Sequence, residues 1–287
     1  MPERDCWSTW LSHGRFGGDA GVERRAMERL RGVRDRVLDQ AGLEPGETAL
    51  DVGCGDGLIA FGALERRAGL CIFSDISRDL LAECRGLAVT LGLLDRCRFV
   101  SAAADDLSPI ESSSVDLVTT RSVLIYVEDK AAAFREFRRV LRPGGRVSLF
   151  EPINRLNRFM RAYDPCDVKE LDERIKAGFE ELQPRDSDPM LDFDDRDLVE
   201  LAEAAGFRRV RLTLEVVTEP PEPMPWQAYL DTAWNPRIPT VREMADRVLS
   251  AEEKERWAAR MCPLVEAGAG STRMASAYLV AVNEEDG

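Results

Sequence analysis

The sequence contains 287 residues, of which 44% are hydrophobic, and its formal net charge is −13. This length and composition suffice for one large or two small globular domains with a substantial core. The negative charge argues against a broad basic surface, so we expect neither nucleic acid nor membrane as a partner. No apolar run approaches the roughly 20 residues of a membrane span, and residues 1–10 lack the features of a signal peptide, which favours a cytoplasmic protein.

The seven cysteines are scattered along the chain without a C-x-x-C pair. An odd number of thiols cannot all pair within one chain, and cytoplasmic proteins keep their thiols reduced. We therefore expect reduced cysteines and no metal site.

Helical and strand patterns alternate in the first half of the sequence. Apolar residues at helical spacing predict a helix over 22–41, which Gly42 closes. A strand over 49–52, a helix over 58–67 and a strand over 70–73 follow and form a βαβ unit.

The alternation continues through the middle of the chain. The patterns predict a helix over 78–91, strands over 98–101 and 115–119, a helix over 130–141 that ends on RPGG, and a strand over 146–150. Five strands alternating with helices indicate a parallel, doubly wound α/β sheet. Such sheets bind ligands outside the carboxyl ends of their strands, at the crevice where the strand order reverses.

Beyond residue 154 the alternation breaks twice. Two long stretches are predicted to be helical insertions, and a capping box from Ser250 to Glu253 begins a helix in the second one. We expect these insertions, with the N-terminal segment, to form a lid over a pocket. The predicted division is N-terminal cap helices over 1–41, a ligand-binding core over 42–154, a lid insertion over 155–191, a core helix and strand over 192–218, a second lid insertion over 219–271, and a last strand with the tail over 272–287.

The sequence ALDVGCGDG, residues 49–57, predicts a cofactor-binding turn after the first strand. Its glycines permit positive φ angles and a close approach of the backbone to a ligand, and the following helix offers free N–H groups. A triphosphate-binding loop requires G-x-x-x-x-G-K-[ST], which is absent. A dinucleotide-binding turn requires G-x-G-x-x-G, but Leu58 stands at the third glycine position and Gly57 comes one residue early. The spacing therefore disfavours both classes.

Four segments in order resemble the class I S-adenosylmethionine-dependent methyltransferases, and in particular their small-molecule branch of ubiquinone/menaquinone-biosynthesis enzymes. These segments are DVGCGDG, FSDIS, VDLVTTRSVLIYV and REFRRVLRPGGRVSLFEP. The resemblance covers residues 45–153. It implies a Rossmann-like seven-stranded sheet that is mostly parallel with an antiparallel last strand, S-adenosylmethionine as cofactor, and methyltransferase activity.

The resemblance also implies roles for individual residues. Asp75 stands where the family grips the ribose hydroxyls, and Ile76 is expected to cover an adenine face. The family usually carries Gly-Asp-Ala after the third strand, and here Ala103 replaces that aspartate, so Asp105 or a backbone carbonyl is expected to meet the adenine amino group. The predicted cofactor-binding residues are Arg15, Asp51, Gly53, Cys54, Gly55, Asp75, Ile76, Ala104, Asp105 and Arg121.

Methyl transfer from a sulfonium depends mainly on positioning, so a general base is needed only for some acceptors. The only histidine, His13, is a candidate base, and the alternative is a surface or structural residue. Tyr126 is a candidate residue facing the methyl group, and the alternative is simple packing. Arg15 either pairs with the cofactor carboxylate or is a solvated charge. Glu151 either faces the acceptor or caps a neighbouring helix.

Five aromatic residues occur in the predicted lid segments. They either wall an apolar or planar acceptor or pack as core between the lid helices. These residues are Trp7, Trp10, Trp226, Tyr229 and Trp234.

The main functional hypothesis is methylation of a small molecule on oxygen, nitrogen or carbon, in a way compatible with specialised metabolism. One alternative is an arsenite methyltransferase, because Cys166 and Cys262 lie in the lid segments. Another is a non-catalytic S-adenosylmethionine-binding protein, which the change at Ala103 allows. The sequence leaves the identity of the acceptor and the oligomeric state open.

Overall fold

The structure is a computed structural model that describes residues 4–157 and 162–284. The chain forms two compact units, each assembled from several stretches of sequence. The helical unit comprises Met1–Glu28, Asn154–Asp192 and Val216–Ala275, and the sheet unit comprises Arg29–Ile153, Phe193–Glu215 and Ser276–Gly287. Parts of the predicted N-terminal cap, first insertion and tail lie outside the described residues, at 1–3, 158–161 and 285–287.

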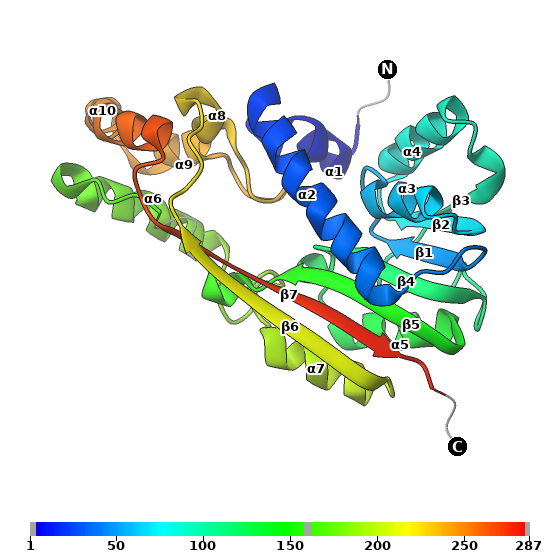
Figure 1. Cartoon of the computed structure of the whole chain (residues 1–287). Helices are drawn as coiled ribbons and strands as arrows, with labels where there is room; N and C mark the ends of the chain where they lie inside the picture. The colour runs from blue at the N-terminus through cyan, green and yellow to red at the C-terminus, as the bar shows by residue number, and fades with distance from the viewer. Residues whose placement is uncertain (1–3, 158–161, 285–287) are drawn as a thin grey trace. The chain divides into compact units, whose positions relative to one another are not determined.

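A seven-stranded sheet in the order β3-β2-β1-β4-β5-β7-β6 is the framework of the sheet unit (Figure 1). The neighbours among β1 to β5 are parallel, and β7 runs antiparallel to β5. The predicted Rossmann-like sheet, mostly parallel with an antiparallel last strand, is confirmed. The strands are β1 (Thr48–Val52), β2 (Leu70–Asp75), β3 (Cys97–Ser101), β4 (Val115–Arg121), β5 (Leu141–Pro152), β6 (Arg208–Glu219) and β7 (Thr272–Val282).

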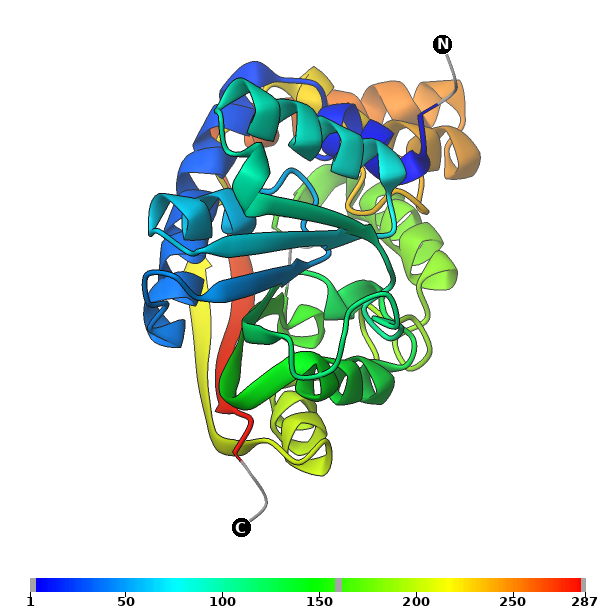
Figure 2. The same cartoon turned by 90° about the vertical axis from the view of Figure 1, so that its right-hand side faces the viewer.

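Helices cover both faces of this sheet (Figure 2). On one face, α2, α3 and α4 bury apolar side chains in a common cluster, whereas α5 packs against β5 and α7 on the other face. Ser77 caps α4 by accepting the Leu80 N–H at 3.1 Å, and Asp129 caps α5 by accepting the Ala132 N–H at 2.7 Å. The helices are α2 (Ala20–Ala41), α3 (Leu58–Glu65), α4 (Arg78–Thr90), α5 (Lys130–Val140) and α7 (Asp195–Ala204), with short turns η2 (Leu94–Arg96) and η3 (Leu124–Tyr126).

The sequence RPGG was expected to end a helix before a strand, and the structure places it inside β5. The strand begins at Leu141, which pairs with Val115, and the register then shifts. Gly144, with φ of 79°, belongs to this irregular stretch, and its N–H donates to the Asn283 carbonyl oxygen at 2.7 Å. The helix ends at Val140, directly before RPGG, but the strand begins at Leu141 and not at the predicted residue 146. It begins early because the neighbouring strand and the residue after β7 supply hydrogen bonds to this backbone.

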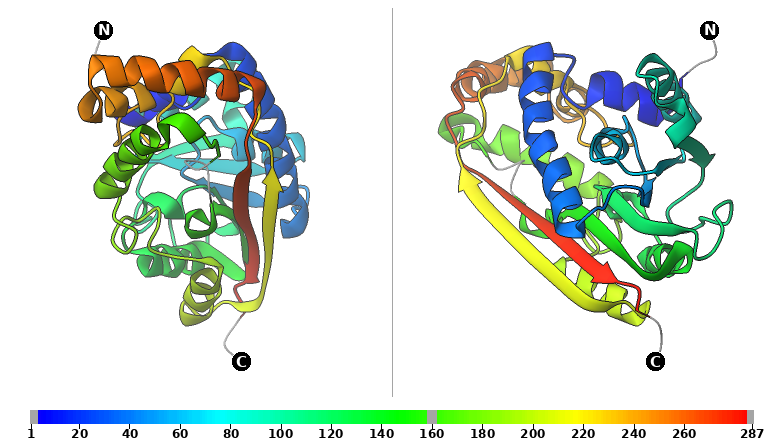
Figure 3. Two further views of the ribbon diagram at one scale, coloured as in Figure 1. Left: turned by 90° about the vertical axis from the view of Figure 1, so that its left-hand side faces the viewer. Right: turned by 45° about the vertical axis from the view of Figure 1, so that its right-hand side comes forward.

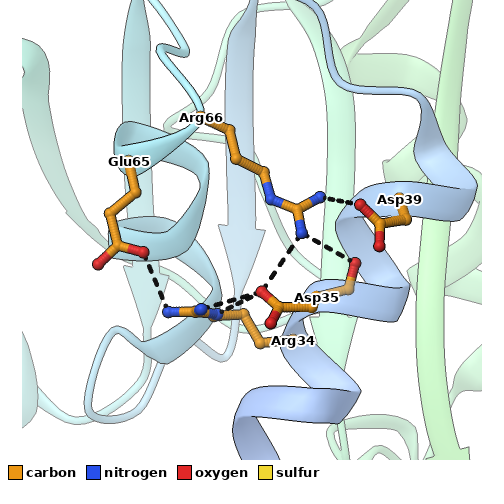
Figure 4. A network of polar contacts seen from close by, with 5 residues as sticks. All are labelled: Arg34, Asp35, Asp39, Glu65 and Arg66. Atoms are coloured by element: carbon orange, nitrogen blue, oxygen red, sulfur yellow. Dashed lines mark hydrogen bonds and ion pairs between the residues drawn. The ribbon is translucent and has the colours of Figure 1, made fainter.

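A polar network joins α2 to the end of α3 (Figure 4). The Arg66 guanidinium donates to Asp39 Oδ1 at 2.5 Å and to Asp35 Oδ1 at 3.3 Å. Arg34 pairs with Asp35 at 2.9 Å and with Glu65 at 3.2 Å. Because these side chains are partly exposed, the pairs orient the two helices more than they stabilise them, at about 1 kcal/mol or less each.

The helical unit contains α1, η1, the first residues of α2 and the helices of both predicted insertions, which Figure 3 shows in further views. Its core joins Leu171 and Phe179 of α6 to Met244 of α9 and Trp257 of α10. The capping box predicted from Ser250 is present at the start of α10. A lid function for these helices stays a prediction. The elements are α1 (Cys6–Thr9), η1 (Trp10–Gly14), η4 (Asn154–Leu156), η5 (Cys166–Val168), α6 (Lys169–Leu182), α8 (Trp226–Asp231), α9 (Val241–Val248) and α10 (Ala251–Ala267).

In the part of the chain that the structure describes, no helix combines the length and the apolar character needed to span a bilayer.

Candidate functional site

The glycine turn, which we define as residues 53–57, connects β1 to α3. Gly53, Gly55 and Gly57 have φ angles of 65°, 53° and 79°, a region that favours glycine over residues with side chains. Gly57 is also the N-cap of α3. The alternating glycines noted in the sequence are therefore explained first by the backbone conformation of the turn itself.

The glycine turn is packed closely between two neighbouring segments. A Cβ atom at Gly53 would lie 2.4 Å from Cγ2 of Val123. Carbon atoms that are not bonded to each other or to a common atom clash at this distance. The N–H of Cys54 donates to the Ser74 carbonyl oxygen at 2.9 Å. The turn is thus held against the end of β2 and against the loop that follows β4.

Asp75 is the last residue of β2 and is only 7% exposed. Its Oδ2 accepts the Gly55 N–H at 2.9 Å, and its Oδ1 accepts the Ser77 N–H at 2.8 Å. The carboxylate therefore ties the end of β2 to the glycine turn and to the start of α4. A carboxylate has about four acceptor positions, so these two backbone bonds are compatible with the predicted binding of ribose hydroxyls.

The segment predicted to meet the adenine lies beside Asp75. The Ala102 N–H donates to the Asp75 carbonyl oxygen at 3.2 Å, and Ala103 forms an isolated bridge with Asp106. Within this turn Ala104 is buried and Asp105 is half-buried. Ile76, directly after Asp75, is 52% exposed, and its contact with the adenine stays a prediction. Adenine recognition by this segment stays a prediction.

Asp51 lies beneath the glycine turn with 3% of its surface exposed. Its Oδ1 accepts the Thr119 hydroxyl at 2.9 Å and its Oδ2 accepts the Ala60 N–H at 3.2 Å. Burial raises the pKa of this carboxyl from 3.8 to about 7, and the charge of Arg121 opposes that rise. The side chain joins β1, β4 and α3, and its predicted contact with the cofactor stays a prediction.

Glu151 is completely buried near the end of β5. Its carboxylate accepts the N–H groups of Val123, Leu124 and Ile125 at 2.9, 3.1 and 3.4 Å, and Thr120 donates its hydroxyl at 3.4 Å. Burial raises the pKa of Glu151 from 4.5 to about 7 despite these bonds. Of the two alternatives left by the sequence, the structure shows the cap, because Glu151 holds the start of η3.

Tyr126 and Arg121 stand at the two ends of the loop that Glu151 holds. Tyr126 is the last residue of η3 and Arg121 is the last residue of β4, and both are half-buried. The Glu151 cap orders the loop between them. The sequence indicated that Glu151 could cap a helix, but not that the cap would position Tyr126 and Arg121. The signal was present as an acidic residue at the end of a predicted strand.

Cys54 contributes its backbone to the glycine turn and its thiol to the core. Its side chain is 3% exposed and belongs to the apolar cluster beneath the turn, as does Cys84 of α4. The neighbouring Cys84 thiol and burial raise the pKa of the Cys54 thiol. Cys84 itself donates to the Gly55 carbonyl oxygen at 3.3 Å, a support of the turn that no sequence motif indicated.

His13 and Arg15 belong to the helical unit. His13 is exposed in η1. The Arg15 guanidinium lies over the rings of Trp10 and Phe16, with centroid distances of 5.7 and 5.2 Å. Their roles at the cofactor stay predictions.

The aromatic residues of the predicted lid pack chiefly with one another inside the helical unit. Trp226 stacks on Tyr229 with a centroid distance of 5.4 Å and lies 5.3 Å from Trp257. Trp234 meets Phe179 of α6 edge to face at 5.0 Å. These contacts correspond to the core-packing alternative.

Comparison with known proteins identifies the region that carries this geometry. Residues 50–149 match the methyltransferase domain family. A 37.1 kDa transposon TN4556 protein of Streptomyces fradiae is 36% identical over 125 residues, and the ubiquinone/menaquinone biosynthesis C-methyltransferase UbiE of Hahella chejuensis is 35% identical over 131 residues. These matches cover 42% and 45% of this chain, and 35% and 52% of the two relatives, so the chain spans about half or less of their length.

A solved structure shows the same fold over most of the chain. The YcgJ protein of Bacillus subtilis aligns with a TM-score of 0.54 at 17% identity, covering 88% of this chain and 98% of that protein. The strand order, the glycine turn and the sequence matches together define a class I S-adenosylmethionine-dependent methyltransferase fold. Residues 50–149 match that family, and the matched region resembles its ubiquinone/menaquinone-biosynthesis branch.

Proposed function

We propose that this protein transfers a methyl group from S-adenosylmethionine to a small-molecule acceptor. The observation that carries the proposal is the buried carboxylate of Asp75, which is hydrogen-bonded to the glycine turn at the ends of two neighbouring parallel strands. In a doubly wound sheet this end of the strands is where ligands bind. The match of residues 50–149 to the methyltransferase domain family supports the same cofactor.

We propose that residues after the ends of β1, β2 and β3 bind S-adenosylmethionine. Asp75 would hold the ribose hydroxyls, Ile76 would cover the adenine, and the turn at Gly55 would lie along the methionyl part. Asp105 would meet the adenine amino group in place of the aspartate that Ala103 replaces. When bound, the cofactor supplies an electrophilic methyl group on its sulfonium.

The contribution of the protein to the reaction is mainly positioning, because an in-line displacement needs an aligned nucleophile more than it needs a charged catalyst. Glu151 accepts the Leu124 N–H and so orders the loop that carries Tyr126. The Tyr126 ring would then help to position the acceptor and would not act as a base. His13 stays the candidate base for acceptors that must lose a proton. The similarity to a C-methyltransferase favours carbon over oxygen or nitrogen as the acceptor atom.

The first test is calorimetric titration of the purified chain with S-adenosylmethionine, S-adenosylhomocysteine and NAD. We expect binding of the two sulfur compounds and none of NAD. Transfer of a labelled methyl group is then measured against a panel of phenols, quinols, amines and arsenite, and product NMR assigns the methylated atom. NAD binding alone, or no binding, would mean that the glycine turn does not hold this cofactor.

The same panel separates the two alternatives. Arsenite turnover that is lost on Cys166→Ser and Cys262→Ser would support the arsenite methyltransferase. Tight cofactor binding without transfer to any acceptor would support the non-catalytic binding protein.

A further inference from the structure

The outermost strand of the sheet, β6, has an open edge. It is the last strand in the sheet order, and among the strands of the described residues its one neighbour is β7. Among residues 4–157 and 162–284, no backbone hydrogen bond joins β6 to a segment outside the sheet. Figures 1 and 3 show this strand in yellow at the border of the sheet. A strand of twelve residues with unpaired N–H and C=O groups is a template for pairing with another strand.

Apolar and charged residues alternate along β6. Val210, Leu212, Leu214 and Val216 share one face, because side chains two apart point the same way. Leu214 is 36% exposed and Val216 is 49% exposed. An apolar row at an open edge is therefore only partly covered.

The charges of β6 are separated along its length. Arginine occupies its N-terminal half, and glutamate its C-terminal half. These residues are Arg208, Arg209, Arg211, Glu215 and Glu219. Two copies of such a strand attract each other when they run antiparallel and repel when they run parallel.

We propose that β6 pairs antiparallel with β6 of a second copy of this chain, about a two-fold axis at Thr213, so that two sheets join into one. In this register Arg211 faces Glu215 of the partner subunit, and the symmetry repeats the pair. Leu212 faces the partner's Leu214 on the opposite face. The surface is self-complementary, as a two-fold interface requires.

This register is favoured over its neighbours. A shift by one residue would set the apolar face of one strand beside the charged face of the other, because the side-chain period is two. A shift by two residues would centre the axis on Leu212 or Leu214, and Thr213 would then stand opposite Arg211 or Glu215. Of these three registers, only the axis at Thr213 pairs Arg211 with Glu215. The shifted registers would set Arg209 opposite Glu215 or Glu219 instead, but Arg209 already forms an ion pair with Glu284.

Glu215 already has one partner within the sheet unit. Arg36 of α2 forms an ion pair with Glu215. The Glu215 side chain nevertheless stays 44% exposed, and Arg211 is exposed. A carboxylate accepts more than one donor, so Glu215 is able to serve Arg36 and the partner's Arg211 together.

The oligomeric state of the full chain tests the proposal, independently of any enzyme activity. Sedimentation equilibrium across a concentration series is expected to show a dimer for the unmodified protein. Arg211→Glu and Glu215→Arg are each expected to raise the dimer dissociation constant at least about tenfold, because two like-charge pairs replace two opposite-charge pairs. Arg98→Glu, on the opposite edge strand β3, is the matched control and is expected to leave the dimer intact.

Mixing the two variants gives a sharper outcome. In a mixed dimer of Arg211→Glu and Glu215→Arg chains, both facing pairs again carry opposite charges, so an equimolar mixture is expected to dimerise when neither variant does alone. A monomeric unmodified protein, or a mixture that stays monomeric, would overturn the proposal.

Hydrogen exchange tests the interface without any substitution. Amides of β6 are expected to exchange more slowly as the protein concentration rises, whereas amides of β3 are not. A dimer whose β6 amides show no such dependence associates through another surface and also overturns the proposal.

Discussion

Asp75 combines a structural and a proposed binding role in one side chain. Its carboxylate accepts the Gly55 and Ser77 N–H groups, and it lies at the end of the sheet where we propose that the cofactor binds. Removing it would therefore disturb both the turn and the ribose site. A substitution that keeps the shape but not the charge separates the two effects.

Asp75→Ala is expected to weaken S-adenosylhomocysteine binding by about 2–3 kcal/mol, because the ribose hydroxyls lose a charged acceptor. Asp75→Asn keeps one oxygen to accept a backbone N–H but places its amide nitrogen against the other N–H. It is expected to recover part of the thermal stability but little of the affinity. Calorimetry and thermal unfolding measure the two quantities. Unchanged affinity in a folded Asp75→Ala variant would remove Asp75 from the site.

The buried carboxyls of Glu151 and Asp51 make stability depend on pH. Both pKa values are raised to about 7, chiefly by burial. Between the unfolded pKa and about pH 7, the folded protein therefore binds more protons than the unfolded chain. The free energy of unfolding falls as pH rises through that window, and the loss is complete above about pH 7.

Glu151→Gln is expected to flatten this dependence. A raised pKa from 4.5 to about 7 corresponds to a loss on the order of 3 kcal/mol on going from about pH 4 to about pH 8. The variant lacks the titrating group, so its unfolding free energy is expected to fall less over the same range. Urea unfolding at several pH values measures this, with the exposed Glu111→Gln as control. Parallel profiles for the unmodified protein and Glu151→Gln would contradict the assignment.

At the scale of elements, the glycine turn depends on two separate demands at Gly53. The residue has a positive φ, and a Cβ atom there would collide with Val123. Gly92, after α4, has a similar φ of 68° but nothing within 4 Å of its Cβ position. The two glycines share a positive φ, and Gly53 differs from Gly92 in the collision that a Cβ atom would meet.

Gly92→Ala is expected to cost about 1 kcal/mol of unfolding free energy, which is the penalty of the left-handed conformation. Gly53→Ala is expected to cost more, by about 1–3 kcal/mol, because overpacking is added to the same penalty. Urea denaturation of both variants gives the difference directly. Equal losses would mean that the loop at Val123 moves aside freely.

The network between α2 and α3 acts as a set of partly exposed ion pairs. Arg66→Gln removes the contacts to Asp35 and Asp39, and it is expected to lower the unfolding free energy by about 1 kcal/mol. The loss is expected to shrink in about 1 M salt, because exposed charges are screened. A loss that salt leaves unchanged would show that packing of the Arg66 side chain is the larger effect.

At the scale of the whole molecule, the family match and the proposed cofactor site lie in the sheet unit. Residues 50–149 fall within its first segment, Arg29–Ile153. The remaining strands of the sheet come from segments that the match does not reach. Ligand binding at the ends of β1 and β2 is therefore expected to stabilise the sheet unit in particular.

S-adenosylhomocysteine at about 100 times its dissociation constant is expected to add about 2.7 kcal/mol to the unfolding free energy of the sheet unit. For a domain of this size that raises the melting temperature by about 5–10 °C. Differential scanning calorimetry measures the shift, with NAD as the matched control. A comparable shift with NAD would contradict the cofactor assignment.

The sequence predicted the local features because their causes are local. Strand and helix periods placed β1 to β5 and the helices between them, and the capping residue at Ser250 marked the start of α10. The glycines of residues 53–57 indicated positive φ angles, because few other residues adopt such angles. The same reasoning was wrong at RPGG, where pairing with distant strands extended β5.

Only the tertiary structure decided which buried groups meet. Glu151 reaches Val123 across 28 residues of sequence, and Asp75 reaches Gly55 across 20. The thiols of Cys54 and Cys84 meet beneath the glycine turn in the same way. No periodicity records such pairs, because they depend on the order in which strands assemble into the sheet. The sequence by itself determined most of the elements and the resemblance of residues 50–149 to methyltransferases, and the assembled sheet decided the partners of each buried carboxylate and thiol.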